Sequence, residues 1–222
     1  MKPLPQRVDG VLFDLDGTLL DSAPDLAAAL DALCGERGVA PPPYATVRAV
    51  VSRGARAVLR RGFPAAEDDA IAALLPRYLD LYAEVLGAGT RPFDGVEALL
   101  STLEGCGVHW GVVTNKPGFL TAPLLQRLGL AQRAAVVVSG DTLAVKKPDP
   151  APVLHACTQI ALDPRRCLFV GDDLRDVEAG RAAGAYTVAA AWGYLDGGDP
   201  HAWNADAVAL APTDLIDWLD CA

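Results

Sequence analysis

Cysteine pairs and long apolar runs are absent from this chain of 222 residues. The cysteines are widely spaced and include no CxxC pair, which argues against a disulfide framework and against a zinc site. No apolar run approaches the roughly 18 residues of a membrane span, and the amino terminus shows no charged region followed by an apolar stretch. We therefore expect a cytoplasmic protein that does not bind membranes. Its cysteines are expected to be small, buried and reduced: Cys34, Cys106, Cys157, Cys167 and Cys221.

Positive charge is also scarce. The chain has 19 lysines and arginines against 28 aspartates and glutamates, so its formal net charge is −9. A chain with this balance and no basic run is repelled by the phosphate backbone of nucleic acids, which excludes a nucleic-acid-binding function. An anionic small molecule would need positive charge gathered at one place.

Strand-like and helix-like segments alternate along most of the chain. Apolar residues make up 51% of the sequence, which is enough for a substantial core. Short apolar runs separated by segments of helical periodicity predict an α/β fold, with a Rossmann-like parallel sheet covered on both faces. In such a sheet the ligand crevice lies at the carboxyl ends of the strands. The predicted strands are 8–13, 110–113, 134–138, 168–170, 187–190 and 207–210.

One stretch, from about residue 22 to residue 89, breaks this alternation. It contains no convincing strand, and its apolar residues recur at helical spacing around 26–33, 47–58 and 71–85. Because this insertion follows directly after a pair of acids, it is placed to cover them as a lid. We predict an α/β core made of residues 1–21 and 90–222, and a helical cap made of residues 22–89.

The acids in question are Asp14 and Asp16, in the run Asp14-Leu15-Asp16-Gly17-Thr18 at the end of the first predicted strand. In a strand, residues two apart point to the same side, so the two carboxylates converge. Their mutual repulsion raises a pKa unless a cation or a proton intervenes. The arrangement indicates a phosphate-handling magnesium site, with a pair of solvated loop acids as the competing interpretation.

Two further motifs follow in the middle of the chain. Thr114, after the strand 110–113, offers a hydroxyl and backbone N–H groups to a phosphate oxygen, although it is equally well placed to cap a helix. Lys147 precedes Pro148, which biases the lysine toward an extended backbone. Its ammonium can neutralise both a carboxylate nucleophile and a phosphate oxygen, whereas Lys146 is interpreted as a solvated neighbour.

The last motif repeats the pattern of a buried strand, a turn and clustered acids. Gly171 allows a close turn after the strand 168–170 and leaves Asp172 pointing at the crevice, where it is the better metal ligand. Asp173 and Asp176 are interpreted as acids that favour the start of the following helix.

Taken in order, DxDGT, a threonine after a buried strand, Lys-Pro before a helix and GDDxxxD resemble the haloacid dehalogenase superfamily. The resemblance covers essentially the whole chain. A helical insertion after the first motif resembles the phosphoglycolate phosphatase branch. Within that branch, the runs that begin at Gly111 and Gly171, and the tail around Trp192 and Trp203, look most like N-acetylmuramic acid 6-phosphate phosphatases.

The resemblance implies a role for each motif. Asp14 would attack phosphorus to form an aspartyl-phosphate, and Asp16 would protonate the leaving oxygen and later take a proton from water. The implied cofactor is Mg²⁺, held by Asp14, Asp172 and the backbone carbonyl of Asp16. The equatorial oxygens of the phosphoryl group would be stabilised by Thr114, Asn115 and Lys147.

Two cap arginines are candidates for binding the rest of the substrate. Arg53 and Arg56 flank Gly54, and a guanidinium there can meet an anionic group at the non-reacting end of the molecule. Solvated arginines on a helix surface are the competing interpretation.

The function that the resemblance implies is a magnesium-dependent phosphatase for a small phosphomonoester, with N-acetylmuramic acid 6-phosphate of peptidoglycan recycling or 2-phosphoglycolate as the substrate. We expect a monomer or a weak homodimer. A sugar phosphomutase of the β-phosphoglucomutase type shares every core motif and is the alternative. A dehalogenase would not need Asp16, and a non-catalytic binding protein would not need to retain Asp14 or Lys147.

Overall fold

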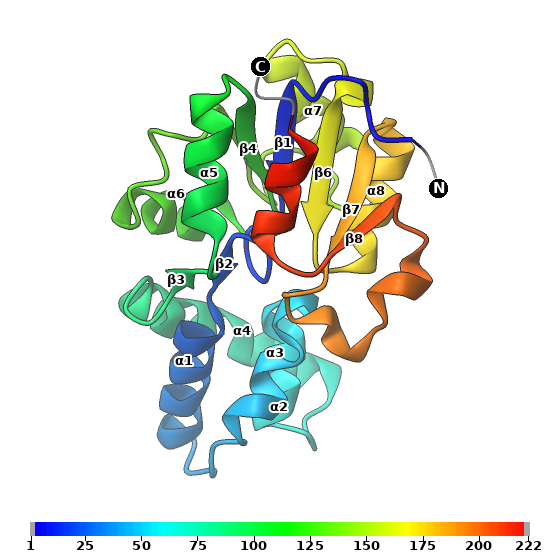
Figure 1. Ribbon diagram of the computed structural model, residues 1–222. Helices are drawn as coiled ribbons and strands as arrows, with labels where there is room; N and C mark the ends of the chain where they lie inside the picture. The colour runs from blue at the N-terminus through cyan, green and yellow to red at the C-terminus, as the bar shows by residue number, and fades with distance from the viewer. Residues whose placement is uncertain (1–2, 220–222) are drawn as a thin grey trace.

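Six strands of the computed structural model form one sheet in the order β5-β4-β1-β6-β7-β8 (Figure 1). Every pairing in it is parallel, which confirms the predicted fold class. The structure describes residues 3–219. The strands of this sheet are β1 (Gly10–Phe13), β4 (His109–Val113), β5 (Val136–Val138), β6 (Cys167–Gly171), β7 (Tyr186–Ala190) and β8 (Ala207–Ala209).

Strand β1 lies in the middle of the sheet, between β4 and β6. Its residues are all buried, because Val11 and Phe13 pack into the apolar cluster on one face while Leu12 packs into the cluster on the other. A strand covered on both faces has no polar alternation, which explains its continuous apolar run. The chain proceeds to β4 on one side of β1 and returns to β6 on the other, so the carboxyl end of β1 lies at the crevice expected for a ligand.

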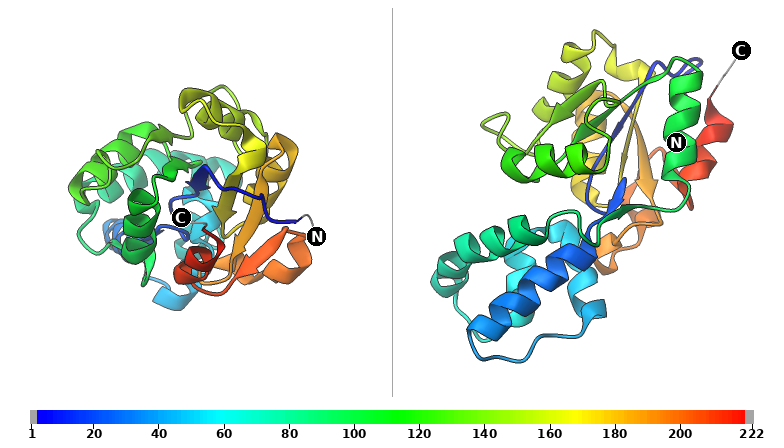
Figure 2. Two further views of the ribbon diagram at one scale, coloured as in Figure 1. Left: turned by 45° about the horizontal axis from the view of Figure 1, so that its top comes forward. Right: turned by 90° about the vertical axis from the view of Figure 1, so that its left-hand side faces the viewer.

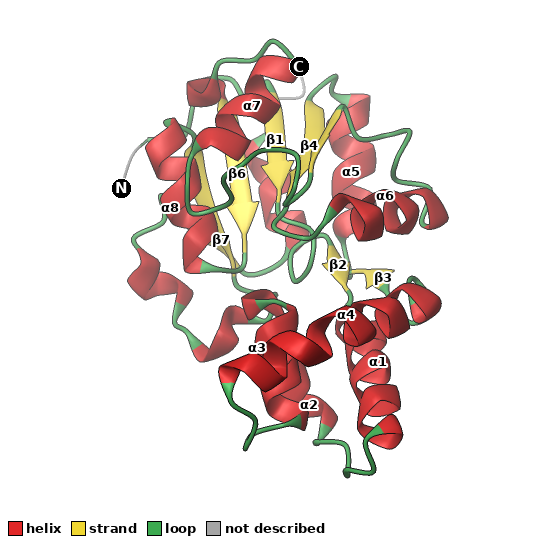
Figure 3. Cartoon of the chain, turned by 180° about the vertical axis from the view of Figure 1, so that it is seen from behind, coloured by secondary structure: helices red, strands yellow, loops and turns green. Residues whose placement is uncertain are grey.

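Helices cover both faces of the sheet. Seen from behind in Figure 3, α7 and α8 lie over the face that buries Leu12. Helix α5 and the short 3-10 helix η5 pack together on the opposite face (Figure 1). These elements are α5 (Val96–Gly105), α6 (Gly118–Arg127), α7 (Ala151–Gln159), α8 (Leu174–Ala183) and η5 (Pro212–Trp218). Loops and 3-10 turns complete this part of the chain: η2 (Pro164–Arg166), η3 (Leu195–Gly197) and η4 (Pro200–Trp203).

The inserted segment is helical and lies beyond the carboxyl ends of the strands (Figures 1 and 3). We call its helices the cap: α1 (Ala23–Glu36), α2 (Tyr44–Arg48), η1 (Val51–Arg53), α3 (Ala55–Gly62) and α4 (Asp68–Val85). Helices α1 and α4 lie side by side, as the turned view in Figure 2 shows, and both contact α3.

The single helix expected across residues 47–58 is wrong. The chain there forms α2, η1 and α3 in succession, and the last two meet at Gly54, whose φ of 83° lies in the left-handed region. A helix cannot continue through that backbone conformation, and glycine adopts it without a steric penalty. The resulting turn lines the cavity between cap and sheet, as do residues of α4 such as Tyr82.

Two short segments join the cap to the sheet. Strand β2 (Leu20–Asp21) pairs antiparallel with β3 (Arg91–Pro92), so the outgoing and returning chains lie side by side. The buried carboxylate of Asp25, at the start of α1, accepts hydrogen bonds from the backbone N–H groups of Gly87, Gly89 and Thr90 and from the hydroxyl of Thr90. The carboxylate of Asp25 therefore joins the start of α1 to the segment through which the chain leaves the cap.

Among the residues that the structure describes, Cys34, Cys157 and Cys167 are free and buried, as expected. The prediction for Cys106 is wrong, since it is disulfide-bonded, and Cys221 lies outside the described residues. Within 3–219 no helix is both long enough and apolar enough to cross a membrane.

Candidate active site

Asp14 and Lys147 form an ion pair at the carboxyl end of β1. The Nζ atom of Lys147 lies 2.7 Å from Oδ1 of Asp14 and 2.7 Å from Oδ1 of Asp176, and it donates a third hydrogen bond to the backbone carbonyl of Val113, also at 2.7 Å. Burial by itself lowers the pKa of an ammonium, but the two carboxylates outweigh burial and raise the pKa of Lys147. Lys147 is therefore a fixed positive charge beside Asp14.

Asp14 and Asp176 belong to a group of three buried carboxylates. Asp14, Asp172 and Asp176 each offer an oxygen, and these oxygens all lie within 4.8 Å of one another. Burial, together with the charge of Asp14, raises the pKa of Asp172 to about 7. One ammonium does not balance three carboxylates, and hard oxygen donors in this number are the ligands that a small divalent cation prefers. The donor set therefore fits a metal ion such as Mg²⁺.

Glycines permit the close approach of these groups. A Cβ atom on Gly17, whose φ is 91°, would lie 2.2 Å from Oδ2 of Asp172, and one on Gly171 would lie 2.2 Å from Oδ2 of Asp176. No side chain fits at either position. This is the physical reason for a glycine directly after Asp16 and directly before Asp172.

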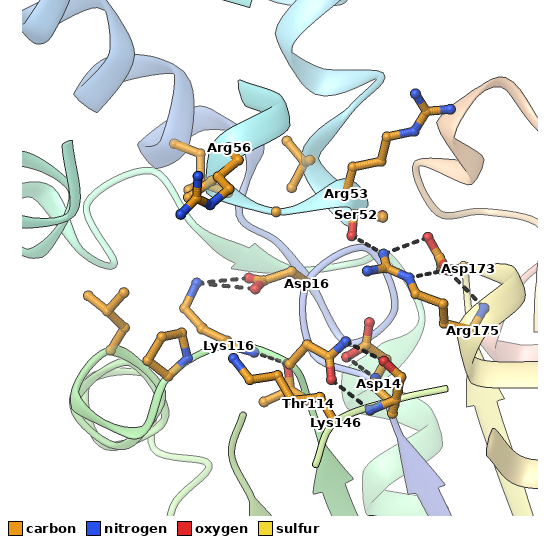
Figure 4. A pocket seen from close by; sticks show the side chains of 18 of the residues that line it. Asp14, Asp16, Ser52, Arg53, Arg56, Thr114, Lys116, Lys146, Asp173 and Arg175 are labelled. Carbon is orange, nitrogen blue, oxygen red and sulfur yellow. Dashed lines mark hydrogen bonds and ion pairs between the residues drawn. The ribbon is translucent and has the colours of Figure 1, made fainter. Parts of the chain in front are cut away.

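The Asp16 carboxylate faces away from this cluster. Both of its oxygens lie 3.2 Å from Nζ of Lys116 (Figure 4). The same ammonium donates to the hydroxyl of Tyr82 at 2.6 Å. Its side chain is thus separated from the three carboxylates that can hold a metal, which leaves the backbone carbonyl as the part of Asp16 predicted to bind Mg²⁺.

Thr114 and Asn115 follow β4 directly, as predicted, and both line the same cavity as Asp14. The backbone N–H of Thr114 donates to Val138, and its hydroxyl accepts from the N–H of Lys116. The carboxamide of Asn115 bonds to the backbone of Lys147 twice, at 3.0 and 3.1 Å. Asn115 therefore positions the lysine, in addition to any contact with a substrate.

The helix that follows Asp172 begins with two acids, as the sequence indicated. Asp173 is the N-cap of α8, and together with Asp176 it forms a capping box. The carboxylate of Asp173 also accepts hydrogen bonds from Nε of Arg175 at 2.7 Å and from Nη2 of Arg175 at 2.8 Å. Asp176 does more than start the helix, because its other oxygen is bound to Lys147.

A cap residue reaches into the site. The hydroxyl of Ser52, in η1, donates to Oδ2 of Asp172 at 2.7 Å, and the backbone carbonyl of Ser52 accepts from Arg175. Asp172 also accepts from the hydroxyl of Thr18 and from the N–H of Tyr194. The cap loop is thus bonded to a candidate metal ligand of the core.

The space between cap and sheet is a cavity of about 360 Å³. Arg53 and Arg56 both line it, but they point differently. In Figure 4, Arg56 extends over the cavity on the side of Asp16 and Lys116, whereas the guanidinium of Arg53 points away from Asp16. The wall also contains leucines from both parts of the molecule: Leu26, Leu75, Leu79 and Leu120.

The comparison with known proteins agrees with these observations. A family profile described as haloacid dehalogenase-like hydrolase matches residues 11–190. The chain belongs to this family. The resemblance found in the motifs is thereby confirmed, and the match includes every core site residue named above.

Two relatives cover almost all of this hydrolase. It is 46% identical over 218 residues to an N-acetylmuramic acid 6-phosphate phosphatase of Pseudomonas aeruginosa, which spans 97% of the chain and 96% of the relative. It is 48% identical over 206 residues to a phosphoglycolate phosphatase of Xanthomonas campestris pv. campestris, with 92% and 93% covered. Both are phosphatases, which confirms the predicted enzyme class.

A solved structure extends the comparison to the fold. The crystal structure of a predicted phosphoglycolate phosphatase from Haemophilus somnus superimposes with a TM-score of 0.85 at 26% identity. The superposition covers 96% of this hydrolase and 98% of the other chain.

Sequence reasoning missed three residues of this site. Asp176 was interpreted only as a helix-start acid, although its place in the first turn of the helix that follows Asp172 keeps it close to that acid. Lys116 lies two positions after Thr114, which was a signal that it also faces the crevice. Ser52 has no local signal, because its partner Asp172 lies 120 positions away in the chain.

Proposed function

We propose that this chain is a Mg²⁺-dependent phosphatase that works through an aspartyl-phosphate, and that its substrate is N-acetylmuramic acid 6-phosphate. The observation that carries the mechanism is Asp14. It lines the cavity, is held at 2.7 Å by the ammonium of Lys147, and stands among three carboxylates that can share a metal.

In the first half of the reaction, an Oδ atom of Asp14 attacks phosphorus. A bond forms between this oxygen and phosphorus while the ester bond to the sugar oxygen breaks. The proton that the leaving oxygen needs comes from Asp16, whose carboxyl faces the cavity on the side toward the cap. Lys147 and the hydroxyl of Thr114 stabilise the negative charge on the phosphoryl oxygens.

In the second half, water attacks the same phosphorus atom and gives its proton to Asp16. The bond to Asp14 breaks, inorganic phosphate leaves, and both acids return to their starting states. Bound Mg²⁺ would offset the charge of the carboxylates and of the phosphate dianion. The residues proposed to hold it are Asp14, Asp172 and the backbone carbonyl of Asp16, with Asp176 as a further carboxylate of the same cluster.

The cavity supports the larger of the two expected substrates. Its volume of about 360 Å³ falls in the range of roughly 300–1,000 Å³ that small-molecule sites occupy. A two-carbon acid phosphate would leave much of this space to water. An N-acetylated sugar with a lactyl ether has two methyl groups for the leucines of the wall and a carboxylate for Arg56.

The second candidate substrate is 2-phosphoglycolate. It also places a carboxylate beyond the reacting phosphate, and the relative from Xanthomonas campestris is named for it. The phosphomutase alternative uses the same first half but returns the phosphoryl group to a sugar. Product analysis separates it from hydrolysis, because only a phosphatase releases inorganic phosphate at each turnover.

Phosphate release should be measured with Mg²⁺ on N-acetylmuramic acid 6-phosphate, 2-phosphoglycolate, hexose phosphates and nucleoside monophosphates. We expect the highest kcat/KM on the first of these. Asp14→Asn, which keeps the shape of the side chain, should be folded by circular dichroism and inactive on all of them. Turnover by that variant at the wild-type rate would refute the aspartyl-phosphate. A preference for hexose phosphates that leads to isomerised sugar would instead support the mutase.

Three further proposals concern the roles of the two parts of the chain, the place of the enzyme in the cell and its oligomeric state. Residues 22–89 act as the cap that selects the substrate, while 1–21 and 90–222 carry the chemistry. The enzyme works in the cytoplasm, where small phosphorylated metabolites are found. It acts as a monomer or a weak homodimer.

A further inference from the structure

Lys116 links the cap to the acid Asp16. Its Nζ atom lies 3.2 Å from each carboxylate oxygen of Asp16 and 2.6 Å from the hydroxyl of Tyr82, so it bridges these two side chains. An ammonium has three N–H donors and no acceptor, and the carboxylate of Asp16 and the hydroxyl of Tyr82 are its hydrogen-bond acceptors here. The Lys116 side chain is only 5% exposed, so water does not replace a lost partner easily.

The three residues come from different parts of the fold. Tyr82 is on α4 of the cap, Lys116 is in the loop after β4, and Asp16 is in the loop after β1. The ring of Tyr82 also makes a cation–π contact with Lys116, whose Nζ atom lies 4.4 Å from the ring centroid. The position of Lys116 is therefore set by the cap and by the core together, and Lys116 in turn holds the carboxylate of Asp16.

We propose that Tyr82 is a positioning residue for the reaction. Through Lys116 it orients the Asp16 carboxyl toward the leaving oxygen, and it does so only when the cap is packed against the core. This inference rests on the proposed role of Asp16 as the proton donor. Lys116 keeps its own protons, and the transferred proton passes from Asp16 to the leaving oxygen as the ester bond breaks.

The physical reason is the geometry of the ion pair. A carboxylate that is held through both oxygens by one ammonium can turn only if that ammonium moves. Removing the Tyr82 hydroxyl frees one N–H of a buried cation, which then shifts toward another acceptor and takes the carboxylate with it. Small displacements of a proton donor lower the rate strongly, because proton transfer requires hydrogen-bond distance.

The test compares two substrates in the Tyr82→Phe enzyme. An alkyl phosphate has a poor leaving group that needs the proton, whereas p-nitrophenyl phosphate has a good one that does not. We expect kcat on the alkyl phosphate to fall about 10-fold and kcat on p-nitrophenyl phosphate to stay within about twofold, with little change in either KM.

Tyr78→Phe is the matched control. Tyr78 is on the same helix and equally buried, and its hydroxyl donates to the carbonyl of Leu26 within the cap at 3.0 Å. This variant loses a buried hydrogen bond of the same kind without touching Lys116. It should show no dependence of its kcat on the leaving group.

Lys116→Met tests the same inference independently. Its kcat on the alkyl phosphate should fall further, relative to its kcat on p-nitrophenyl phosphate, than in Tyr82→Phe. Adding Tyr82→Phe to Lys116→Met should not lower this ratio again. Equal losses on both substrates in Tyr82→Phe, or a rise in KM on both without a change in kcat, would overturn the inference. So would a dependence on leaving group in the control.

The same experiment separates this inference from the proposed function. If kcat of Asp16→Asn falls more on the alkyl phosphate than on p-nitrophenyl phosphate and kcat of Tyr82→Phe does not, only the positioning role of Tyr82 is refuted. If Asp16→Asn also loses kcat equally on both substrates, the proposed role of Asp16 as proton donor is refuted.

Discussion

The hydroxyl of Ser52 in the cap lies 2.7 Å from Oδ2 of Asp172 in the core. Asp172 is buried and belongs to the carboxylate cluster that fits a metal. Hydrogen bonds to a metal-ligating carboxylate fix its orientation, and losing such a partner typically lowers metal affinity about 10- to 100-fold. Because Ser52 is on the cap, the contact would link Mg²⁺ binding at Asp172 to the position of the cap, and such a linkage is reciprocal.

Ser52→Ala should therefore weaken Mg²⁺ binding by about 10-fold. Isothermal titration of the metal-free protein measures this without relying on turnover. The control is Thr46→Ala, because the Thr46 hydroxyl is also on the cap but bonds only to the carbonyl of Pro43. If both variants bind Mg²⁺ like the wild type, the Ser52 hydroxyl does not support the metal site.

Removal of the metal should abolish activity. The carboxylates of Asp14, Asp172 and Asp176 would face a phosphate dianion with Lys147 as the cation among them, and one ammonium does not balance that charge. Chelator should stop phosphate release and added Mg²⁺ should restore it. Full activity in excess chelator, with metal shown to be absent by elemental analysis, would refute the proposed cofactor.

The cap arginines should set the preference for a carboxylate-bearing substrate. Arg56 points over the cavity and Arg53 points away from Asp16 (Figure 4), so we expect the larger effect from Arg56→Ala. Its kcat/KM on N-acetylmuramic acid 6-phosphate should fall about 10- to 100-fold, the loss of one charge-assisted hydrogen bond worth roughly 1.5–3 kcal/mol.

Hydrolysis of p-nitrophenyl phosphate, which has no carboxylate, should barely change in either arginine variant. Arg53→Ala serves as the comparison on the other side of Gly54. A wild-type preference for the acid over its uncharged analogue in both variants would mean that the selecting residue lies elsewhere in the cap.

Asp25 should be the stability determinant of the connection between cap and core. Its buried carboxylate accepts hydrogen bonds from Gly87, Gly89 and Thr90. Asp25→Ala leaves these donors without an acceptor, and we expect it to lower the free energy of unfolding by about 2–4 kcal/mol. Urea unfolding followed by circular dichroism measures the change.

Asp31→Ala is the control for that measurement. Asp31 is an exposed aspartate on the same helix, so its replacement should change stability by no more than about 0.5 kcal/mol. Equal losses in the two variants would show that the effect belongs to the helix and not to the hydrogen bonds of Asp25.

The sequence was sufficient to predict the sheet. Buried parallel strands are continuous apolar runs, and each predicted run, such as 168–170 within β6, corresponds to a strand of the sheet. It was also sufficient to place Asp14, Thr114 and Asp172 at one edge, because the carboxyl ends of parallel strands meet there. The helical nature of the insertion followed from its 3.6-residue period, although not the break at Gly54, since a left-handed glycine leaves no mark on the apolar pattern.

Only the tertiary structure decided which side chains act on one another. Lys147 pairs with Asp176 as well as Asp14, and Ser52 and Tyr82 reach the core from the cap. Local periodicity describes how each segment folds, but the docking of the cap on the core depends on packing between segments far apart in the chain. The role predicted for Asp14 therefore rests on its motif, whereas the contacts between the site and the cap could be found only in the folded molecule.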